Sequence, residues 1–211
     1  RYDRVVTSGA VTHTLGQDHA QGKAYYVGPP RDLSLFGGQM VKDVPMAEAH
    51  AVLCTGLVND DVETPDDYGG LLARMKDLKL PMICANPDKI VRKGDCLLYC
   101  AGSLAEKYAG MGGTVLMAGK PYEPIYNLAL QTAGTIAGRQ IEKSKVLAIG
   151  DGPETDIKGA ADFGIGAPPP AWWGGGDPPA RGTQRGRYRG PRWTAPGLRC
   201  RRRRDVLCAP P

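Results

Sequence analysis

The sequence predicts an α/β fold built on a largely parallel sheet with helices on both faces. Short apolar runs of four or five residues alternate with helical segments along the first 167 residues. Runs of this length are too short for helices and are typical of buried strands. Turn residues and a helix-starting residue follow most of them. Repeated β-α-β units of this kind favour a parallel sheet covered on both sides.

The expected strands are rich in Val, Ile, Leu and Tyr, which pack well on a pleated surface. They occupy residues 4–7, 23–27, 51–54, 81–85, 114–117 and 146–149. The last run, Val146-Leu-Ala-Ile149, ends at Gly150, which lets the backbone turn. We expect it to be a buried strand that presents Asp151 at its carboxyl end.

The expected helices begin at residues suited to a first turn. They run from Gly9 to Gly16, Thr64 to Leu78, Ser103 to Gly110, Glu123 to Ala137 and from about Thr155, with a weaker one over 33–40. Thr7 or Ser8 can cap the first of them. Ser103 and Glu106 match a capping box, in which each side chain pairs with the other residue's backbone N–H. We expect residues 86–95 to form a loop.

Charge and composition separate the last 44 residues from the rest. Residues 1–167 hold 17 Lys and Arg against 20 Asp and Glu, whereas residues 168–211 hold ten Arg, no Lys and two Asp. These net charges, −3 and +8, give the chain its +5. Pro and Gly supply 16 of the 44 tail residues, so we expect a disordered tail. Such a composition is also typical of G+C-rich coding DNA read out of frame, and we hypothesise a frameshift near Ala167.

Length, apolar runs and cysteines limit the class of protein. At 211 residues the chain is long enough to bury a sizeable core. No apolar run approaches a membrane span and no signal peptide opens the chain, so we expect a cytoplasmic protein. The six cysteines form no C-x-x-C pair, and Cys54 and Cys84 fall inside expected strands, as buried thiols in a reducing compartment do. Because the chain opens at Arg1 and enters a strand-like run at once, we expect an N-terminally truncated fragment.

Two acidic residues are expected to converge after the last strand. Asp151 follows that strand directly, and Asp156 lies in the first turn of the helix expected from Thr155. Carboxylate oxygens at the carboxyl edge of an open α/β sheet suit a hard cation such as Mg2+. The alternative is that both acids only stabilise the start of the helix, where Asp is common.

Several short motifs follow one another in order. They are Thr7-Ser-Gly9, Cys54-Thr-Gly56, Met82-Ile-Cys-Ala-Asn-Pro-Asp88, Gly102-Ser-Leu-Ala-Glu106, Gly112-Gly113, Gly119-Lys-Pro121, Ile125-Tyr126 and Gly150-Asp-Gly-Pro-Glu-Thr-Asp156. This series resembles the class IIA, NagD-like branch of the haloacid dehalogenase (HAD) superfamily over about residues 1–167. The resemblance implies a Rossmann-like core, residues 1–19 and 113–167, with an inserted α/β cap domain of the C2 type, residues 20–112. The tail, residues 168–211, lies outside both.

The resemblance also implies a Mg2+-dependent phosphatase that hydrolyses a small phosphorylated metabolite through an aspartyl-phosphate. It makes Asp151 the Mg2+ ligand, Lys120 the lysine that neutralises the phosphoryl group, and Asp156 an acid that orients its neighbours. We expect Lys120 to face Asp151 across a pocket sized for a metal-bound phosphoryl group. A solvated surface lysine is the alternative for Lys120.

Asn86-Pro87-Asp88 matches the substrate-facing loop of the family's cap. By resemblance, Asn86 and Asp88 contact the leaving group and Pro87 fixes the shape of the loop. The alternative is a plain turn, to which Asn-Pro-Asp is almost equally suited.

Two parts of the family pattern have no match. No Asp-x-Asp pair, which supplies the nucleophile and the acid/base, precedes the expected cap, and the Ser/Thr-Asn phosphate-binding motif before Thr7 is missing. Asp60-Asp61 and Asp66-Asp67 lie inside the expected cap and cannot substitute. We therefore expect these 211 residues alone to be an inactive phosphatase.

Two other functions compete with this one. A non-catalytic α/β protein would use the Arg-rich tail, with its Trp and Tyr residues, to bind RNA or another polyanion. A nucleotide-binding Rossmann domain would use the glycines of Gly110-Met-Gly-Gly-Thr114 and Gly150-Asp-Gly152. Neither segment completes G-x-G-x-x-G at a strand-to-helix turn.

Overall fold

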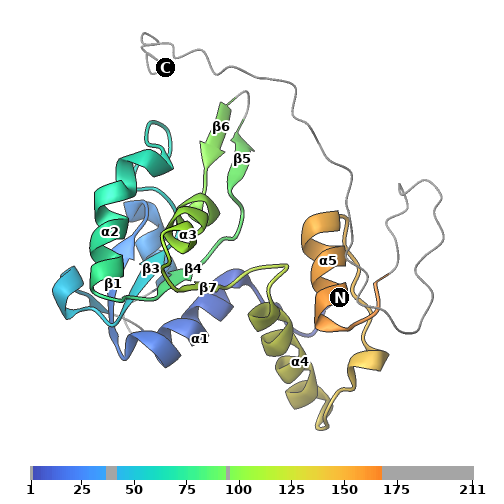
Figure 1. Ribbon diagram of the computed structural model, residues 1–211. Helices are drawn as coiled ribbons and strands as arrows, with labels where there is room; N and C mark the ends of the chain where they lie inside the picture. Colours follow the sequence, from blue (N-terminus) through green and yellow to red (C-terminus); the bar gives the residue numbers. More distant parts are fainter. Residues whose placement is uncertain (1, 37–41, 94–95, 168–211) are drawn as a thin grey trace, which may run out of the picture. The chain divides into compact units, whose positions relative to one another are not determined.

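Five parallel strands form the central sheet of the computed structural model, which describes residues 2–36, 42–93 and 96–167 (Figure 1). In spatial order they are β2 (Lys42–Asp43), β1 (Lys23–Val27), β3 (Ala51–Cys54), β4 (Met82–Cys84) and β7 (Val115–Met117). All neighbouring strands run parallel, and Leu53 lies opposite Tyr26 on one side and Ile83 on the other. The predicted parallel sheet is confirmed.

Helices cover both faces of this sheet. One face packs against α1 (Ser8–Ala20), which contributes Leu15 and Ala20 to a cluster with strand residues. The other face packs against α2 (Gly69–Asp77) and α3 (Ala101–Gly110). The fully buried large residues of these two helices are Leu72, Met75, Leu104 and Tyr108. Burial of one such side chain stabilises the fold by roughly 1.5–3 kcal/mol. The described core is centred on β1, β3 and β4.

The starts of two helices follow the predicted chemistry. Thr7 Oγ1 accepts a hydrogen bond from the Ala10 N–H (3.2 Å) and so satisfies one of the unpaired donors at the start of α1. Before α2, a short 3-10 helix spans Pro65–Tyr68. Asp67 Oδ2 accepts from the Thr64 N–H (2.8 Å), which fixes where this turn begins.

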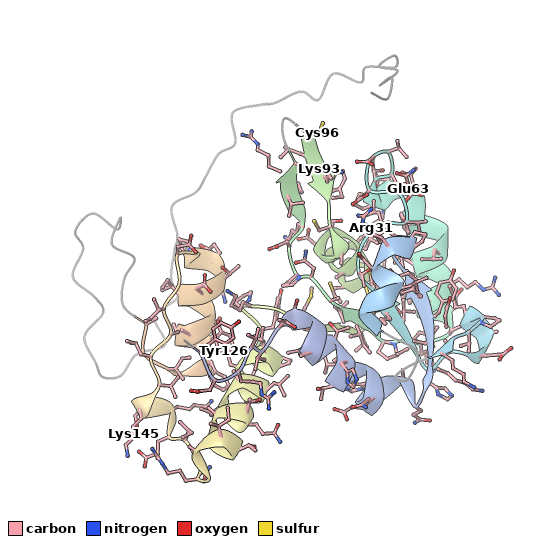
Figure 2. All side chains as sticks on the ribbon, turned by 180° about the vertical axis from the view of Figure 1, so that it is seen from behind. Arg31, Glu63, Lys93, Cys96, Tyr126 and Lys145 are labelled. Atoms are coloured by element: carbon pink, nitrogen blue, oxygen red, sulfur yellow. The ribbon has the colours of Figure 1, made fainter. Side chains whose placement is uncertain are left out.

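A β-hairpin begins inside the segment predicted to be a loop. β5 (Ile90–Lys93) pairs antiparallel with β6 (Cys96–Tyr99). Figure 2 shows Lys93 and Cys96 near the tip of this hairpin. The loop prediction is wrong for Ile90–Lys93. A two-stranded ribbon buries little, and its sequence therefore lacks a clear apolar alternation.

α3 begins earlier than the capping-box pattern predicted. Cys100 precedes its first turn, so Ser103 and Glu106 both lie inside the helix. Ser103 Oγ donates to the Cys100 carbonyl oxygen (2.6 Å), and Glu106 pairs with Lys89 (2.6 Å). The prediction is wrong because a first-turn Ser can bond the preceding backbone as readily as it can cap.

Residues 146–149, predicted to be a buried strand, are neither regular nor buried. Their one pairing is an isolated parallel bridge between Leu147 and Gly166. Leu147 and Ile149 are 62% and 84% exposed. An apolar run becomes a strand only where neighbouring strands satisfy its backbone groups, and within the described ranges no strand lies beside it. The strand predicted over residues 4–7 is likewise absent.

The C-terminal part of the described chain is built from two helices. α4 (Glu123–Ala137) spans the predicted range, although none of its residues is buried. α5 (Lys158–Phe163) follows a π-helical turn, Pro153–Ile157, and so begins three residues later than predicted. α4 contacts both α5 and α1, which ties this part to the sheet.

The described residues all belong to one compact unit. β7 pairs with β4, so the predicted boundary between cap and core at residue 113 falls between two partners of one sheet. That domain division stays a prediction. None of the described helices is long and apolar enough to span a membrane. The predictions for residues 168–211 lie outside the described ranges.

Candidate functional site

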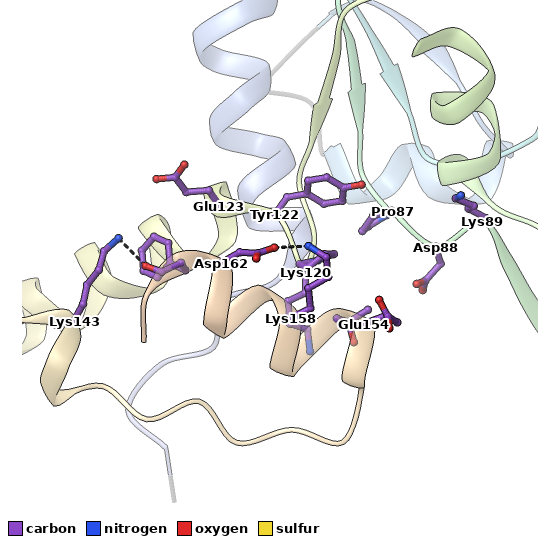
Figure 3. Close-up of a pocket in the computed structure, with 13 residues that line it drawn as sticks. Pro87, Asp88, Lys89, Lys120, Tyr122, Glu123, Lys143, Glu154, Lys158 and Asp162 are labelled. Atoms are coloured by element: carbon purple, nitrogen blue, oxygen red, sulfur yellow. Dashed lines mark hydrogen bonds and ion pairs between the residues drawn. The ribbon is translucent and has the colours of Figure 1, made fainter. Parts of the chain in front are cut away.

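An open pocket of about 680 Å3 lies among the loop after β4, the loop after β7 and helix α5 (Figure 3). Its lining residues are Pro87, Asp88, Lys89, Lys120, Pro121, Tyr122, Glu123, Lys143, Glu154, Thr155, Lys158, Asp162 and Phe163. Four of them are lysines and four are carboxylic acids. The pocket is therefore strongly polar, and how its charges pair decides what it can bind.

Lys120 reaches the pocket from the loop between β7 and α4. A cis peptide bond links it to Pro121. Its Nζ forms an ion pair with Oδ1 of Asp156. The Lys120 side chain is 47% exposed and that of Asp156 only 16%, so the ammonium group lies on the solvent side of the pair. An ammonium group has three N–H donors, and this pair uses one.

Asp156 is held by the turn that precedes it. Its Oδ2 accepts from the Gly152 N–H (3.1 Å), so both carboxylate oxygens are engaged. A Cβ on Gly150 would lie 2.3 Å from Asp156 Cγ, which leaves room only for glycine. Burial acts to raise the pKa of Asp156, but the hydrogen bonds from Lys120 and Gly152 outweigh it, and the pKa lies below its ordinary value. Asp156 is thus ionised at neutral pH.

An aromatic pair joins the two helices around the pocket. Tyr126 of α4 stacks on Phe163 of α5, with ring centroids 5.2 Å apart. The Tyr126 hydroxyl donates to the Thr155 carbonyl oxygen (3.4 Å), and a Cβ on Gly159 would lie 2.2 Å from that hydroxyl. This close approach fixes α5 against α4, and with it the place of Asp156 relative to Lys120.

The loop after β4 is seated on the start of α3. Asn86 Oδ1 accepts from the Asp88 N–H (3.0 Å), and the Asp88 carbonyl oxygen accepts from the Gly102 N–H (3.0 Å). Pro87 lies against the loop after β7, because a Cβ on Gly119 would be 2.6 Å from Pro87 Cδ. Two loops more than thirty positions apart in the sequence thus meet at the pocket.

The other lysines of the pocket have different partners. Lys89 pairs with Glu106 (2.6 Å), and Lys158 pairs with Asp162 on the same helix. Lys143 instead donates to a backbone carbonyl oxygen. Three of the four ammonium groups therefore have a carboxylate partner.

Four of the predicted site residues come together here. Pro87, Asp88 and Lys120 line the pocket, and Asp156 lies behind Lys120 as its partner. The positions agree with a site shared by these residues, while their catalytic roles stay predictions.

Asn86 and Asp151 are not among the lining residues. The Asn86 side-chain oxygen is used inside its own loop, and Asp151 is exposed in a bend. We predicted that Lys120 would face Asp151, but its partner is Asp156. The π-helical turn over Pro153–Ile157 brings Asp156 toward the loop after β7. The predicted place of Asp156, in the first turn of a helix from Thr155, did not indicate this approach.

Sequence reasoning missed six charged residues of the pocket, namely Lys89, Glu123, Lys143, Glu154, Lys158 and Asp162. The spacing of Lys158 and Asp162 on α5 is that of an i,i+4 ion pair, which the sequence could have indicated. Nothing local marks Lys143, which the folding of the chain brings to Phe163 twenty positions later.

The two acids predicted near the metal differ in how they are engaged. In the described part of the chain, no group of three His, Cys, Asp or Glu residues is placed to hold a metal ion. Asp156 is engaged through both oxygens, whereas Asp151 has no hydrogen-bond or ion-pair partner among the described residues. Mg2+ commonly takes one or two protein carboxylates together with phosphate oxygens and water. Of the two acids, Asp151 is the one whose carboxylate is not engaged by a described residue, and its role as a Mg2+ ligand stays a prediction.

The glycines do not form a dinucleotide-binding turn. Gly110 ends α3 and the chain then enters β7, so Gly110–Thr114 joins a helix to a strand rather than a strand to a helix. Gly150 and Gly152 surround the Asp156 carboxylate instead of an open phosphate cradle. The nucleotide-binding alternative has no support in this geometry.

A family model described as HAD-hydrolase-like matches residues 117–167, which include Lys120, Asp151 and Asp156. None of the curated proteins matches the chain significantly.

Among solved structures, the chain is similar to a hydrolase of the haloacid dehalogenase-like family from Brucella suis 1330. The two share 47% identity with a TM-score of 0.69, over 83% of this chain and 66% of that chain. A p-nitrophenyl phosphatase from Archaeoglobus fulgidus shares 19% identity with a TM-score of 0.59, over 76% and 58% of the two chains. A glycerol phosphate phosphatase from Mycobacterium tuberculosis, solved with calcium, shares 21% identity with a TM-score of 0.55, over 77% and 46%.

The two more distant similarities concern the fold alone. The chain spans 66% of the length of the Brucella suis protein and a smaller share of the other two. The 47% sequence identity with the Brucella suis hydrolase agrees with the parallel α/β fold, as does the family-model match over residues 117–167. The chain belongs to the haloacid dehalogenase-like hydrolase family.

Proposed function

We propose that this chain is part of a phosphomonoester hydrolase and that Lys120 binds the phosphoryl group of its substrate. One observation carries the proposal: Lys120, held by Asp156, opens into the same pocket as Pro87 and Asp88. The Lys120 cation on one wall can bind an anionic group of a substrate. The loop after β4, on the opposite wall, can contact the leaving group joined to it. The activities of two structural neighbours, a p-nitrophenyl phosphatase and a glycerol phosphate phosphatase, support the same reaction class.

Lys120 would act through its charge. Attack on a phosphoryl group brings negative charge toward oxygens that are already anionic, and a fixed ammonium group lowers that repulsion. Asp156 keeps the ammonium group directed into the pocket, while the two donors that the pair leaves free can bind phosphoryl oxygens. Asp156 is in this proposal a positioning residue.

The loop after β4 would contact the leaving group. The Asp88 carboxylate has no ion-pair partner among the described residues and is exposed. It can accept hydrogen bonds from hydroxyl groups of a small metabolite, and the Asn86 amide can donate to them. Pro87 sets the distance of this loop from Lys120 through its contact with Gly119.

Asp151 is the residue we propose as a Mg2+ ligand. Bound there with other ligands, Mg2+ would supply charge to stabilise the phosphoryl oxygens. With one carboxylate in the described part, we expect Mg2+ binding to the chain to depend on added phosphate. Calorimetric titration of Mg2+ with and without phosphate tests this, and Asp151→Ala should remove the phosphate-dependent part. Tight Mg2+ binding without phosphate, unchanged in Asp151→Ala, would place the metal elsewhere.

The attacking group is not supplied by an Asp-x-Asp pair, since the 211 residues contain none. We therefore expect no hydrolysis of p-nitrophenyl phosphate above background by this chain with Mg2+. Robust turnover that is lost in Asp151→Ala would contradict this expectation.

A chimera tests the reaction class directly. Residues 8–167 replace the matching part of the Brucella suis hydrolase, which is first assayed by itself for hydrolysis of p-nitrophenyl phosphate. The chimera should keep Mg2+-dependent hydrolysis, and Lys120→Met should reduce it by about 100-fold or more, as expected for loss of a charge that stabilises a transition state. Lys145→Met is the matched control, because Lys145 pairs with Glu142 and does not line the pocket. A folded chimera equally active with and without Lys120 would exclude the proposed role.

A further inference from the structure

Lys143 differs from the other lysines of the pocket. Its Nζ donates to the Phe163 carbonyl oxygen (2.9 Å) and lies 3.6 Å from the centre of the Phe163 ring. Within the described ranges it has no carboxylate partner, whereas the other three lysines each have one. Lys143 is therefore the lysine of this pocket whose ammonium group is not engaged in an ion pair with a described residue.

The ammonium group of Lys143 is held in place rather than free. Phe163 is 7% exposed and stacks on Tyr126, so the carbonyl oxygen and the ring form a fixed support. A cation over an aromatic face is attracted by the ring's quadrupole. One of three N–H donors is used by Phe163, and Lys143 is exposed at the pocket wall, which leaves two donors for a ligand.

Charge is distributed unevenly along the pocket. Figure 3 shows Lys143 at one end and Asp88 at the other, with Lys120 between them. Glu154 also lies well away from Lys143 in this view. Lys120 and Lys158 are each paired with a carboxylate. Glu123 lies on the same side as Lys143 in Figure 3, but no ion pair joins the two, so the Lys143 ammonium group stays available to a ligand.

We propose that Lys143 is a second anion-binding residue of this pocket and that the substrate carries a carboxylate or a second phosphoryl group besides the one held by Lys120. The inference rests on the proposed function, since it places one phosphoryl group at Lys120. A charge-assisted hydrogen bond to a fixed ammonium group gives affinity that a neutral hydroxyl in the same place does not. Lys143 is thereby a specificity-determining residue.

Lys143 also has a structural role that the experiment must separate from binding. The Phe163 carbonyl oxygen is the last of α5, and a cation at a helix C-terminus stabilises the helix. Lys143→Gln keeps a donor for that carbonyl and removes the charge. Lys143→Arg keeps both donor and charge.

The test is a calorimetric titration of the full chain at low ionic strength with three probes. Glycerol 3-phosphate carries one phosphoryl group, 3-phosphoglycerate adds a carboxylate, and 2,3-bisphosphoglycerate adds a second phosphoryl group. We expect one or both of the latter two to bind about tenfold more tightly than glycerol 3-phosphate, the size expected for a hydrogen bond to a charged group. The preference should fall to about twofold or less in Lys143→Gln and persist in Lys143→Arg. Lys145→Gln, whose residue lies outside the pocket lining, should leave it unchanged.

The outcomes separate the two proposals. A preference for the carboxylate probe or for the bisphosphate alone identifies the second group and supports the inference in either case. Equal binding of all three probes, or a preference unaltered by Lys143→Gln, overturns it while leaving Lys120 as the phosphoryl site. Binding of glycerol 3-phosphate that is absent, or that is insensitive to Lys120→Met, would overturn the proposed function and this inference together. The Arg-rich tail is the same in every variant, so its contribution cancels from the comparison.

Discussion

Asp156 is the residue on which the orientation of Lys120 depends. It takes one hydrogen bond from the lysine and one from the Gly152 backbone, in a turn that admits only glycine at position 150. A carboxylate engaged in this way binds protons less readily in the folded chain than in the unfolded one. The pair is half open to water, so its contribution to stability is modest.

The stability effect of Asp156 should depend on pH. Because its folded pKa is depressed, its contribution is present above the unfolded pKa, about 3.9, and is lost as pH falls through the folded value. We expect Asp156→Asn to lower the free energy of unfolding by about 0.5–1 kcal/mol at pH 7. The difference from the wild type should shrink below about pH 4. Urea unfolding of both proteins between pH 3 and 8 measures this difference in the free energy of unfolding. A difference that grows on acidification would contradict the pairing of Asp156 with Lys120.

Gly119 controls how closely the two loops of the pocket approach. A Cβ there would meet the Pro87 ring at 2.6 Å, so Gly119→Ala must push the loops apart. We expect a loss of about 1–3 kcal/mol in the free energy of unfolding, as for overpacking. Gly70→Ala is the matched control: nothing lies within 4 Å of its Cβ, and alanine in α2 should stabilise by about 0.5–1 kcal/mol. Equal effects of the two substitutions in thermal unfolding would show that the loops are not in contact.

At the scale of elements, the segment 146–149 behaves differently from the strands of the sheet. Ile149 is 84% exposed, whereas Ile83 in β4 is fully buried between helices. Ile149→Asn should therefore change the stability of this chain by about 0.5 kcal/mol or less, while Ile83→Ala should cost about 2–5 kcal/mol. Denaturant unfolding of the two variants decides between the observed exposure and the buried strand that the apolar run predicted. A cost of several kcal/mol for Ile149→Asn would favour the buried strand.

The elements that the sequence predicted well are those whose signal is local. Lys23–Val27 and Ala51–Cys54 are apolar, β-branched or aromatic runs buried in the sheet, and both strands lie at the predicted positions. Thr7 caps α1 because a helix start needs an acceptor beside its first N–H groups. Where the outcome depends on distant partners, as for residues 146–149, local patterns were not sufficient.

The same distinction holds for the candidate site. Lys120 and Asp156 were identified from short motifs, but their pairing results from the π-helical turn that no motif encodes. Lys143 was missed because its role arises from a contact with Phe163 that only the folded chain creates. Spacing in the sequence finds residue types suited to phosphate chemistry, and the fold decides which of them share a pocket.

For the whole molecule, the fold is that of an HAD-like hydrolase, and we propose that its pocket binds a phosphoryl group. The sheet carries the loops after β4 and β7 to the pocket, and the π-helical turn before α5 supplies Asp156, which holds Lys120. Binding of a phosphoryl group should then be separable from hydrolysis, since the first needs Lys120 and the second needs an attacking group as well.

The most direct measurement is a titration of the 211-residue chain with inorganic phosphate, followed by NMR signals of the backbone amides near Lys120. Saturable shifts should appear at Lys120 and Asp156. The phosphate affinity should weaken by about tenfold or more in Lys120→Met and remain unchanged in the control Lys145→Met, whose lysine pairs with Glu142 outside the pocket lining. Phosphate binding of equal strength with and without Lys120, or shifts confined to other parts of the chain, would contradict the assignment of this pocket.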